Sequence, residues 1–206
     1  MKVGIVNYRM GNVFSITQAV EKLGYETFVA NNPDELNKAD KIILPGVGSF
    51  NKAMNNLNEA GWTKILNNLV KENGIPLLGI CLGMHLLGQS SNEVCLTKGL
   101  SFISGNVVNL NQLDCKLRIP HVGWNEVKIK RDPLFDKIAQ NSDFYFVHSY
   151  AFKNVDEKLI FATTNYDIEI IAVIKSQNIF GTQFHPEKSS SPGRQFLKNF
   201  LATTKC

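Results

Sequence analysis

The residue of this sequence with the clearest capacity for chemistry is Cys81. It follows an apolar run, Ile75–Ile80, and has glycines two positions before and after it, Gly79 and Gly83. This pattern is typical of a nucleophile elbow, where a strand turns sharply into a helix and small neighbours permit the strained backbone. The helix N-terminus favours the thiolate, which is the reactive form of a cysteine. The alternative is a buried structural cysteine, and the two glycines favour the nucleophile.

A thiolate that attacks a carbonyl group needs a base, which later protonates the leaving group, and a third group that orients the base. Among the four histidines of the chain, His185 is followed two residues later by Glu187. Pro186 favours extended backbone at the preceding residue, and residues i and i+2 of an extended chain share a face. We therefore expect Glu187 to lie beside His185 and orient it. A surface His-Pro-Glu turn is the alternative.

A second glycine-containing segment, residues 45–48 (Pro-Gly-Val-Gly), lies between a strand pattern and a helix pattern. In open α/β sheets such a segment faces the crevice at the carboxyl ends of the strands, where ligands bind. Backbone N–H groups there can stabilise a developing oxyanion. The expected donors are Gly46, Val47, Gly48 and Leu82. A phosphate-binding loop is the competing interpretation, but the segment lacks both GxGxxG and the P-loop lysine.

The elements that must position these residues alternate along the N-terminal half. Strands are expected at Val3–Asn7, Tyr25–Ala30, Lys41–Leu44 and Ile75–Ile80. Helices are expected at residues 13–23, capped by Asn12 and ended by Gly24, and at Phe50–Asn58 and Trp62–Lys71. This order is the signature of βαβ units. It predicts an α/β fold with an open, mostly parallel twisted sheet and helices on both faces.

The pattern changes after Lys98, where short alternating segments follow one another. We expect strands at Leu100–Val108, Leu117–Ile119, Val127–Lys130, Phe144–Val147, Leu159–Thr163, Glu169–Ile174 and Ile179–Phe184. These segments predict an antiparallel or mixed extension of the sheet, and Pro192–Ala202 predicts a closing helix. With 206 residues and an apolar fraction of 44%, we expect residues 1–206 to form a single domain.

Composition and charge exclude several function classes. Lys and Arg number 22 against 18 acidic residues and form no basic run, so nucleic-acid and membrane-surface binding have little support. The most apolar stretch, 75–88, is shorter than the roughly 20 residues of a membrane span. The first residues read as a strand and not as a secretion signal, so we expect no export. We expect Cys81, Cys95, Cys115 and Cys206, which include no CxxC pair, to be free thiols in a reducing cytoplasm, with no metal site.

The order Gly-x-Cys-x-Gly followed by His-Pro-Glu resembles the class I (triad) glutamine amidotransferases. Within that family, blocks along the whole chain resemble the glutaminase subunits of imidazole glycerol phosphate synthases. These blocks are residues 7–12, 44–50, 79–84, 120–125, 145–150 and 184–189. The resemblance implies the amidotransferase variant of a flavodoxin-like α/β fold, which is the fold class that the element order predicts.

The resemblance also implies roles. Cys81 would form a γ-glutamyl thioester, with His185 as base and then acid and Glu187 orienting it. Glutamine would be hydrolysed without a cofactor, and the ammonia would pass to a (βα)₈-barrel synthase subunit in a heterodimer that makes imidazole glycerol phosphate and AICAR in histidine biosynthesis. The positions matching substrate-binding residues are His85, Glu93, His148, Ser149 and Tyr150. Those matching the docking face for the barrel are Trp124, Asn125 and Lys188.

Three positions depart from the family pattern. His85 stands where glutamine is usual, four residues after the nucleophile and on the same helix face. It can donate to the substrate in place of glutamine, serve as a neutral spacer, or, if protonated, favour the thiolate. Arg9 and Asp167 stand where small residues are usual.

Other functions remain open at this point. A paralogous glutaminase that supplies ammonia to an enzyme modifying a surface-glycan sugar would retain the triad and change at such positions. A non-catalytic binding module of the same fold, in which His85 blocks glutamine, and a cysteine peptidase are alternatives from other classes. The peptidase has the least support, because the sequence has no obvious extended substrate groove.

Overall fold

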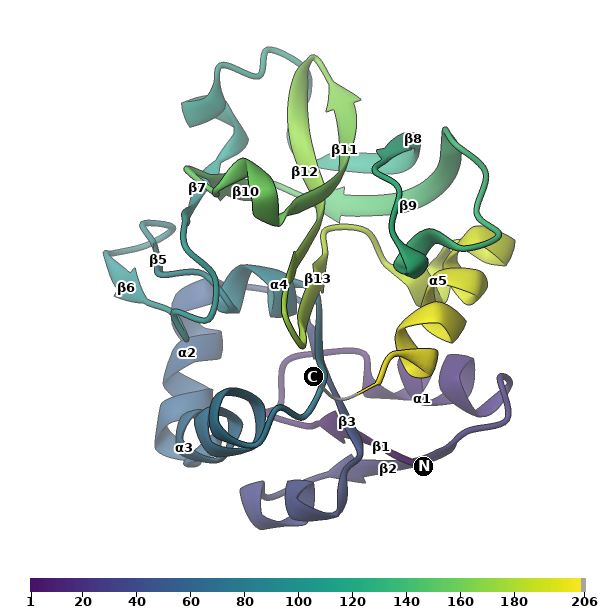
Figure 1. Cartoon of the computed structure of the whole chain (residues 1–206). Helices are drawn as coiled ribbons and strands as arrows, with labels where there is room; N and C mark the ends of the chain where they lie inside the picture. The colour runs from purple at the N-terminus through teal and green to yellow at the C-terminus, as the bar shows by residue number, and fades with distance from the viewer. Residues whose placement is uncertain (205–206) are drawn as a thin grey trace.

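The computed structural model describes residues 1–204 and contains two sheets (Figure 1). The nine-stranded sheet has the order β2-β1-β3-β4-β13-β12-β11-β8-β9. Its strands are β1 (Lys2–Val6), β2 (Glu26–Ala30), β3 (Lys41–Gly46), β4 (Leu77–Cys81), β8 (His121–Ile129), β9 (Ser142–His148), β11 (Ile160–Tyr166), β12 (Ile168–Ser176) and β13 (Ile179–Thr182). The four-stranded sheet, of order β10-β7-β5-β6, consists of β5 (Ser90–Ser91), β6 (Thr97–Lys98), β7 (Asn106–Asn109) and β10 (Tyr150–Lys153).

Five α-helices connect and cover these strands. They are α1 (Val13–Glu21), α2 (Phe50–Glu59), α3 (Trp62–Leu66), α4 (Leu82–Leu86) and α5 (Ser190–Ala202). A π-helix, Asn67–Glu72, continues α3, so the expected helix Trp62–Lys71 is present but changes its winding partway. Short 3₁₀ helices occupy Pro33–Lys38, Leu110–Leu113, Pro133–Phe135, Glu157–Leu159 and Pro186–Lys188.

Four strands of the N-terminal half, together with β13, form the parallel part of the large sheet. Strands β2, β1, β3, β4 and β13 run parallel to one another, and the residues of β3 and β4 are buried throughout. Helices α1 and α5 cover one face of this part and α2 and α3 the other (Figure 1). Two separate apolar clusters occupy these two faces, one centred on Phe50 and Trp62 and the other on Ile16 and Phe196. The expected doubly covered parallel sheet is confirmed.

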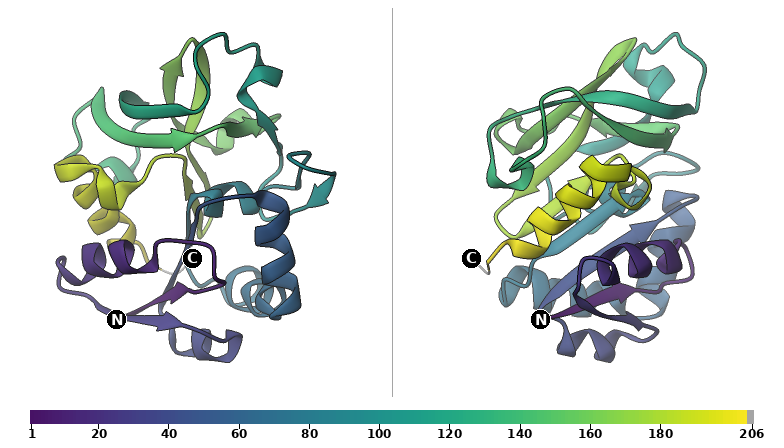
Figure 2. Two further views of the ribbon diagram at one scale, coloured as in Figure 1. Left: turned by 180° about the vertical axis from the view of Figure 1, so that it is seen from behind. Right: turned by 90° about the vertical axis from the view of Figure 1, so that its right-hand side faces the viewer.

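The large sheet continues as an antiparallel extension. Strands β12, β11, β8 and β9 pair antiparallel with their neighbours, and Figure 2 shows them at the end of the molecule away from β1 and β2. Strand β8 exposes Val122, Trp124 and Glu126 and turns the residues between them inward. The expected antiparallel extension is therefore confirmed, and β8 has one solvent-facing side.

One expected strand is only partly present, and another is wrong. In the segment Leu100–Val108 only residues from Asn106 onward form a strand, because the backbone N–H groups of Leu100 and Phe102 donate to the carbonyls at the end of α4. The segment Leu117–Ile119 forms no strand. Its neighbour Lys116 donates its N–H to the Asp167 carboxylate, and the Arg118 carbonyl accepts from the Tyr166 hydroxyl. Side chains of the β11–β12 turn thus replace strand partners.

Candidate active site

Cys81 is the last residue of β4 and immediately precedes α4. Its backbone has φ 53° and ψ −110°, a conformation that a residue with a Cβ atom rarely adopts. Such strain persists only where the surrounding structure holds it, and it is concentrated at functional sites. The side chain is 7% exposed. The expected elbow is therefore present in the backbone, with the sulfur at the edge of a cleft.

The two glycines that flank Cys81 allow β3, β4 and α4 to approach closely. A Cβ atom on Gly83 would overlap the carbonyl oxygen of Leu44, and one on Gly79 would lie 2.6 Å from the Gly83 carbonyl oxygen. Both positions therefore exclude any side chain. The elbow depends on this contact between backbones.

Substituting Gly83 with alanine tests this contact. We expect Gly83→Ala to lower the free energy of unfolding by about 3 kcal/mol, because a methyl group is forced into backbone atoms that cannot move away. The measurement is chemical unfolding of the full chain. Gly24→Ala is the control, because Gly24 has φ +85° but no atom within 4 Å of its Cβ position, and conformational strain alone costs about 1 kcal/mol. Equal losses in the two variants would contradict this interpretation.

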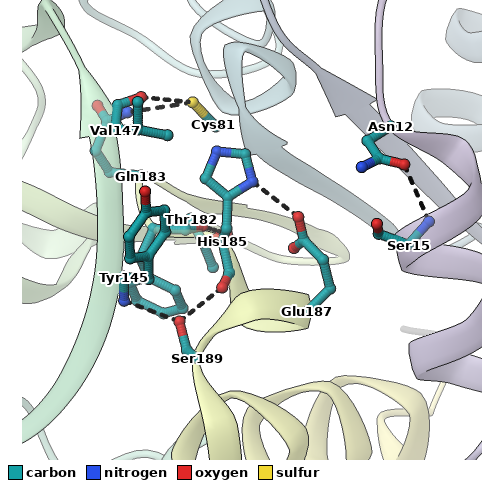
Figure 3. Close-up of polar contacts among 11 residues, drawn as sticks. Asn12, Ser15, Cys81, Tyr145, Val147, Thr182, Gln183, His185, Glu187 and Ser189 are labelled. Atoms are coloured by element: carbon teal, nitrogen blue, oxygen red, sulfur yellow. Dashed lines mark hydrogen bonds and ion pairs between the residues drawn. The ribbon is translucent and has the colours of Figure 1, made fainter. Parts of the chain in front are cut away.

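His185 and Glu187 come to the same place from the loop after β13. The Nδ1 atom of His185 lies 2.8 Å from Oε1 of Glu187, and the two side chains are only 4% and 5% exposed. The backbone of His185 is fixed by a bond from its N–H to the Tyr145 carbonyl and by one from the Ser189 hydroxyl to its own carbonyl. Figure 3 shows its imidazole between the Glu187 carboxylate and the sulfur of Cys81.

The electrostatics of His185 follow from its two neighbours. Burial alone would lower its pKa, but the hydrogen bonds and charges of Cys81 and Glu187 outweigh burial and raise the pKa to about 10. Its Nε2 atom is buried and has no hydrogen-bond partner among residues 1–204. The arrangement therefore favours an imidazolium whose free N–H faces the sulfur of Cys81.

A cleft of about 510 Å³ opens beside Cys81 and is lined by most of the other expected site residues. All five positions expected to bind substrate line it: His85, Glu93, His148, Ser149 and Tyr150. Three of the four expected oxyanion donors also line it: Val47, Gly48 and Leu82. Gly46, the fourth, pairs with Cys81 in the β3–β4 register. The structure thus brings residues from four distant parts of the chain to one cavity.

Glu93 has a structural contact in addition to its place in the cleft. Its Oε2 atom accepts a 2.6 Å hydrogen bond from the backbone N–H of Phe50, the first residue of α2. This bond ties the loop that carries Glu93 to the segment that follows Gly48. Binding of the substrate amino group by Glu93 remains a prediction.

His85 is buried and hydrogen-bonded to Gln183, a site residue that the sequence did not predict. Its Nε2 atom lies 2.7 Å from Oε1 of Gln183. Burial lowers the pKa of His85 to about 4, against the opposing effect of this bond, so the ring is neutral at neutral pH. A protonated His85 is therefore disfavoured. Gln183 lies two residues before His185, just as Glu187 lies two residues after it. The same rule, that residues i and i+2 of an extended chain share a face, could therefore have identified Gln183 as a site residue.

His148, which lines the cleft, is paired with a second buried histidine, His121. His148 contacts the Tyr150 carbonyl through Nδ1 (2.8 Å) and Nδ1 of His121 through Nε2 (3.0 Å). Burial lowers the pKa values of His148 and His121 to about 3 and 4. The side-chain amide nitrogen of Asn125 lies 3.5 Å from Nε2 of His121. It also donates a hydrogen bond to the Asn165 carbonyl. Both imidazoles are therefore neutral, and the Asn125 side chain is turned inward.

The expected docking residues Trp124 and Lys188 both lie next to one aromatic ring, that of Tyr145. Trp124 is 52% exposed, and its ring centroid lies 5.9 Å from that of Tyr145. The ammonium of Lys188 lies 5.9 Å from the same Tyr145 ring. Trp124 lies on strand β8 and Lys188 ends the 3₁₀ helix Pro186–Lys188, and exposed aromatic and cationic side chains of this kind are typical interface anchors. Contact of these residues with a partner remains a prediction.

Three further observations concern cysteines, metals and membranes. Cys81, Cys95 and Cys115 are free thiols, and Cys206, which was expected to be free as well, lies outside the described residues. No group of three His, Cys, Asp or Glu side chains within residues 1–204 is arranged to hold a metal ion. No helix in the same range has the length and apolar character needed to cross a membrane.

Comparisons with known proteins agree with this geometry. The family model described as glutamine amidotransferase class-I matches residues 5–204. The chain is 48% identical to imidazole glycerol phosphate synthase subunit HisH 2 of Methanococcus maripaludis, over 97% of this chain and 98% of that one. It is 46% identical to subunit HisH 1 of Campylobacter jejuni, over 96% and 98%.

A solved structure shows the same fold at lower identity. The structure of PurLQS from Thermotoga maritima matches with a TM-score of 0.75 at 17% identity, over 97% of both chains. Fold, near-complete coverage and identity above 45% to two curated subunits lead to one conclusion. The chain belongs to the class-I glutamine amidotransferases, in the family of imidazole glycerol phosphate synthase subunits named HisH.

Proposed function

We propose that this chain is a glutaminase that hydrolyses L-glutamine to glutamate and ammonia through Cys81, His185 and Glu187. One observation carries the proposal: an imidazole bonded to a buried carboxylate faces a cysteine sulfur on a strained strand-to-helix turn (Figure 3). A thiolate, a base and a group that orients the base are the parts that acyl transfer from an amide requires. The family assignment names the amide as that of glutamine.

The reaction follows from the positions of these groups. The Cys81 thiolate attacks the carboxamide carbon of glutamine, and the carbonyl oxygen becomes an oxyanion. The donors we assign to it are the backbone N–H groups of residues 47, 48 and 82, which line the cleft. His185 gives its Nε2 proton to the departing nitrogen, which leaves as ammonia. The neutral imidazole then takes a proton from water, which attacks the thioester carbon. The C–S bond breaks and glutamate leaves.

The ammonia is used by a partner. The relatives are named as subunits of imidazole glycerol phosphate synthase, and we assign this chain the same place: the glutaminase of a heterodimer with a (βα)₈-barrel subunit that uses ammonia in histidine biosynthesis. We treat residues 1–206 as one amidotransferase domain, because the family model spans residues 5–204. We place the protein in the cytoplasm, where free thiols such as Cys95 stay reduced.

Turnover by the assembled pair tests the function. We expect the chain, co-purified with a barrel subunit from the same organism, to release glutamate from glutamine and to deliver the ammonia to the synthase reaction. Glutamate is measured by an enzyme-coupled assay, and the synthase product by chromatography. The control is the same complex with Cys81→Ala supplied with ammonium salt, which bypasses the glutaminase. Absence of glutamate release from a well-formed complex would contradict the proposal.

A second candidate function differs in the acceptor of the ammonia. Two relatives carry numbered subunit names, HisH 1 and HisH 2, and this chain has His85 and Arg9 where the family usually has other residues. These observations fit a paralogue that supplies ammonia to an enzyme modifying a surface-glycan sugar. Rescue of a histidine auxotroph that lacks its own glutaminase subunit, by this chain and a barrel subunit from the same organism, would favour the histidine pathway.

The docking face gives a separate prediction. We expect Trp124→Ala to raise the dissociation constant of the complex about 30-fold, because truncation of a central aromatic anchor typically costs about 2 kcal/mol. We expect Lys188→Ala to have a smaller effect in the same direction. The measurement is titration calorimetry with the barrel subunit.

The control for the docking variants is Lys2→Ala. Lys2 begins β1 and so lies at the amino ends of the parallel strands, whereas Cys81 ends β4 at the opposite edge. We expect this variant to bind like the wild type. Wild-type affinity for Trp124→Ala would place the interface elsewhere.

A further inference from the structure

Gln183 is the only fully buried amide side chain that the structure places against the sulfur of Cys81 within residues 1–204. Its Nε2 atom lies 4.0 Å from the Cys81 sulfur, at the outer limit of a hydrogen bond to sulfur, and the residue has no exposed surface (Figure 3). Its backbone is fixed by a bond from its N–H to the Ala172 carbonyl on β12. The side chain therefore has few orientations available.

The second contact of this amide is with His85. Oε1 of Gln183 lies 2.7 Å from Nε2 of His85, which is 5% exposed. In this orientation the carbonyl oxygen accepts from the ring, so the neutral imidazole carries its proton on Nε2. The reversed amide would turn its carbonyl oxygen toward the sulfur and would require the other tautomer of His85, with the proton on Nδ1. With the proton on Nε2, the His85 bond holds the N–H end of Gln183 toward Cys81.

The Val147 carbonyl and the Gln183 amide both contact the Cys81 sulfur, and they favour opposite protonation states of that sulfur. The carbonyl of Val147 lies 3.7 Å from the sulfur and can accept only from the thiol. The Gln183 amide can donate to the sulfur, and such a bond strengthens when the acceptor is charged. Apart from the imidazolium of His185, Gln183 is thus the side chain that favours the thiolate.

We propose that Gln183 is a catalytic residue that donates a hydrogen bond to the Cys81 thiolate, and that His85 is a positioning residue that holds the Gln183 amide in this orientation. This inference rests on the proposed thiolate chemistry of Cys81. It also accounts for His85: its Nε2 proton is committed to Gln183, so the ring acts through that amide while its edge lines the cleft.

The pH dependence of Cys81 alkylation by iodoacetamide, with the adduct located by peptide mass spectrometry, measures the thiolate without any glutamine turnover. The titratable side chains around the sulfur include His185, His85, His148 and Tyr8, and the nearby carboxylates are Glu93 and Glu187. His185 is held protonated, as described above. His85 and His148 are neutral because burial lowers their pKa values, and burial followed by the charge of Cys81 raises the pKa of the Tyr8 hydroxyl.

Gln183→Met removes the donor and keeps the volume, whereas Gln183→Glu keeps an oxygen for His85 and replaces the N–H donor by oxygen. We expect both to slow alkylation of Cys81 at pH 7 about 10- to 100-fold and to move its midpoint to higher pH, since hydrogen bonds to charged groups are the strong ones. Thermal unfolding establishes that each variant is folded. Because the two variants differ in polarity, the test can still be made with one of them if the other misfolds.

The His85 variants separate positioning from packing. His85→Gln provides an amide N–H that can still donate to Oε1 of Gln183, and we expect its alkylation midpoint to stay at the wild-type value. His85→Leu fills the space without a donor, and we expect an intermediate loss because the Gln183 amide is free to rotate. A folded Gln183→Met protein with the wild-type midpoint would overturn the inference. An ordinary thiol midpoint near 8.5 in the wild type would overturn the thiolate chemistry itself and the inference with it.

Discussion

Replacing Cys81 with alanine is expected to lower kcat for glutamine hydrolysis by at least about 10⁴-fold, because loss of the nucleophile of an acyl-transfer triad removes the covalent route altogether. The strained backbone at φ 53° is then held without a function, so stability is expected to change little or to increase. The measurement is glutamate release by the complex with the barrel subunit. Unfolding of the variant is followed in parallel.

Cys95→Ala is the matched control for this prediction. Cys95 is a free, exposed thiol whose sulfur accepts a bond from Asn51 on α2. We expect this variant to retain wild-type turnover. A Cys81→Ala protein that hydrolyses glutamine within tenfold of the wild-type rate would mean that another group performs the attack.

Replacing Glu187 with glutamine is expected to lower kcat about 10²- to 10⁴-fold, the range over which general acid–base groups contribute. The variant keeps the shape of the side chain and removes its charge. The pKa of His185 then falls, because one of the two groups that raise it against burial is gone. The imidazolium that faces Cys81 is therefore lost at lower pH, and less thiolate is present at neutral pH.

The sign of the pH effect follows from the raised pKa. The pKa of His185 is raised to about 10 from its ordinary 6.5, so the stability that the charged ring contributes is fully present below pH 6.5 and is lost as the pH rises through about 10. In Glu187→Gln the alkaline limb of the kcat/KM profile is expected to move to lower pH. Glu26→Gln, at the exposed start of β2, is the control. An unchanged alkaline limb in Glu187→Gln would show that the carboxylate does not act on His185.

The parts of the site that the sequence predicted are those defined by local spacing. Gly79 and Gly83 frame Cys81 within five residues, and Glu187 follows His185 at the i+2 spacing of an extended chain. The alternation of strands and helices before residue 81 likewise reflects local periodicity, and the parallel sheet with both faces covered was predicted from it. These features need no knowledge of which distant segments meet.

The parts that the sequence did not predict depend on long-range packing. His85 and Gln183 are 98 residues apart, and only the β4–β13 pairing brings them together. The contact between Trp124 and Tyr145 depends on the β8–β9 register in the same way. The expected strand from Leu100 begins only at Asn106, because the first residues bond to the backbone at the end of α4 and pack in the same apolar cluster.

The most direct test of the account is the site of reaction with a glutamine-analogue chloromethyl ketone in the complex with the barrel subunit. The thiol of Cys95 is exposed and accessible, whereas the sulfur of Cys81 is buried beside a cleft and faces the imidazole of His185. We predict an adduct on Cys81 that excess glutamine prevents, with Cys95 unmodified. An adduct on Cys95 with Cys81 intact would contradict the claim that Cys81, His185 and Glu187 form a glutamine-specific acyl-transfer site.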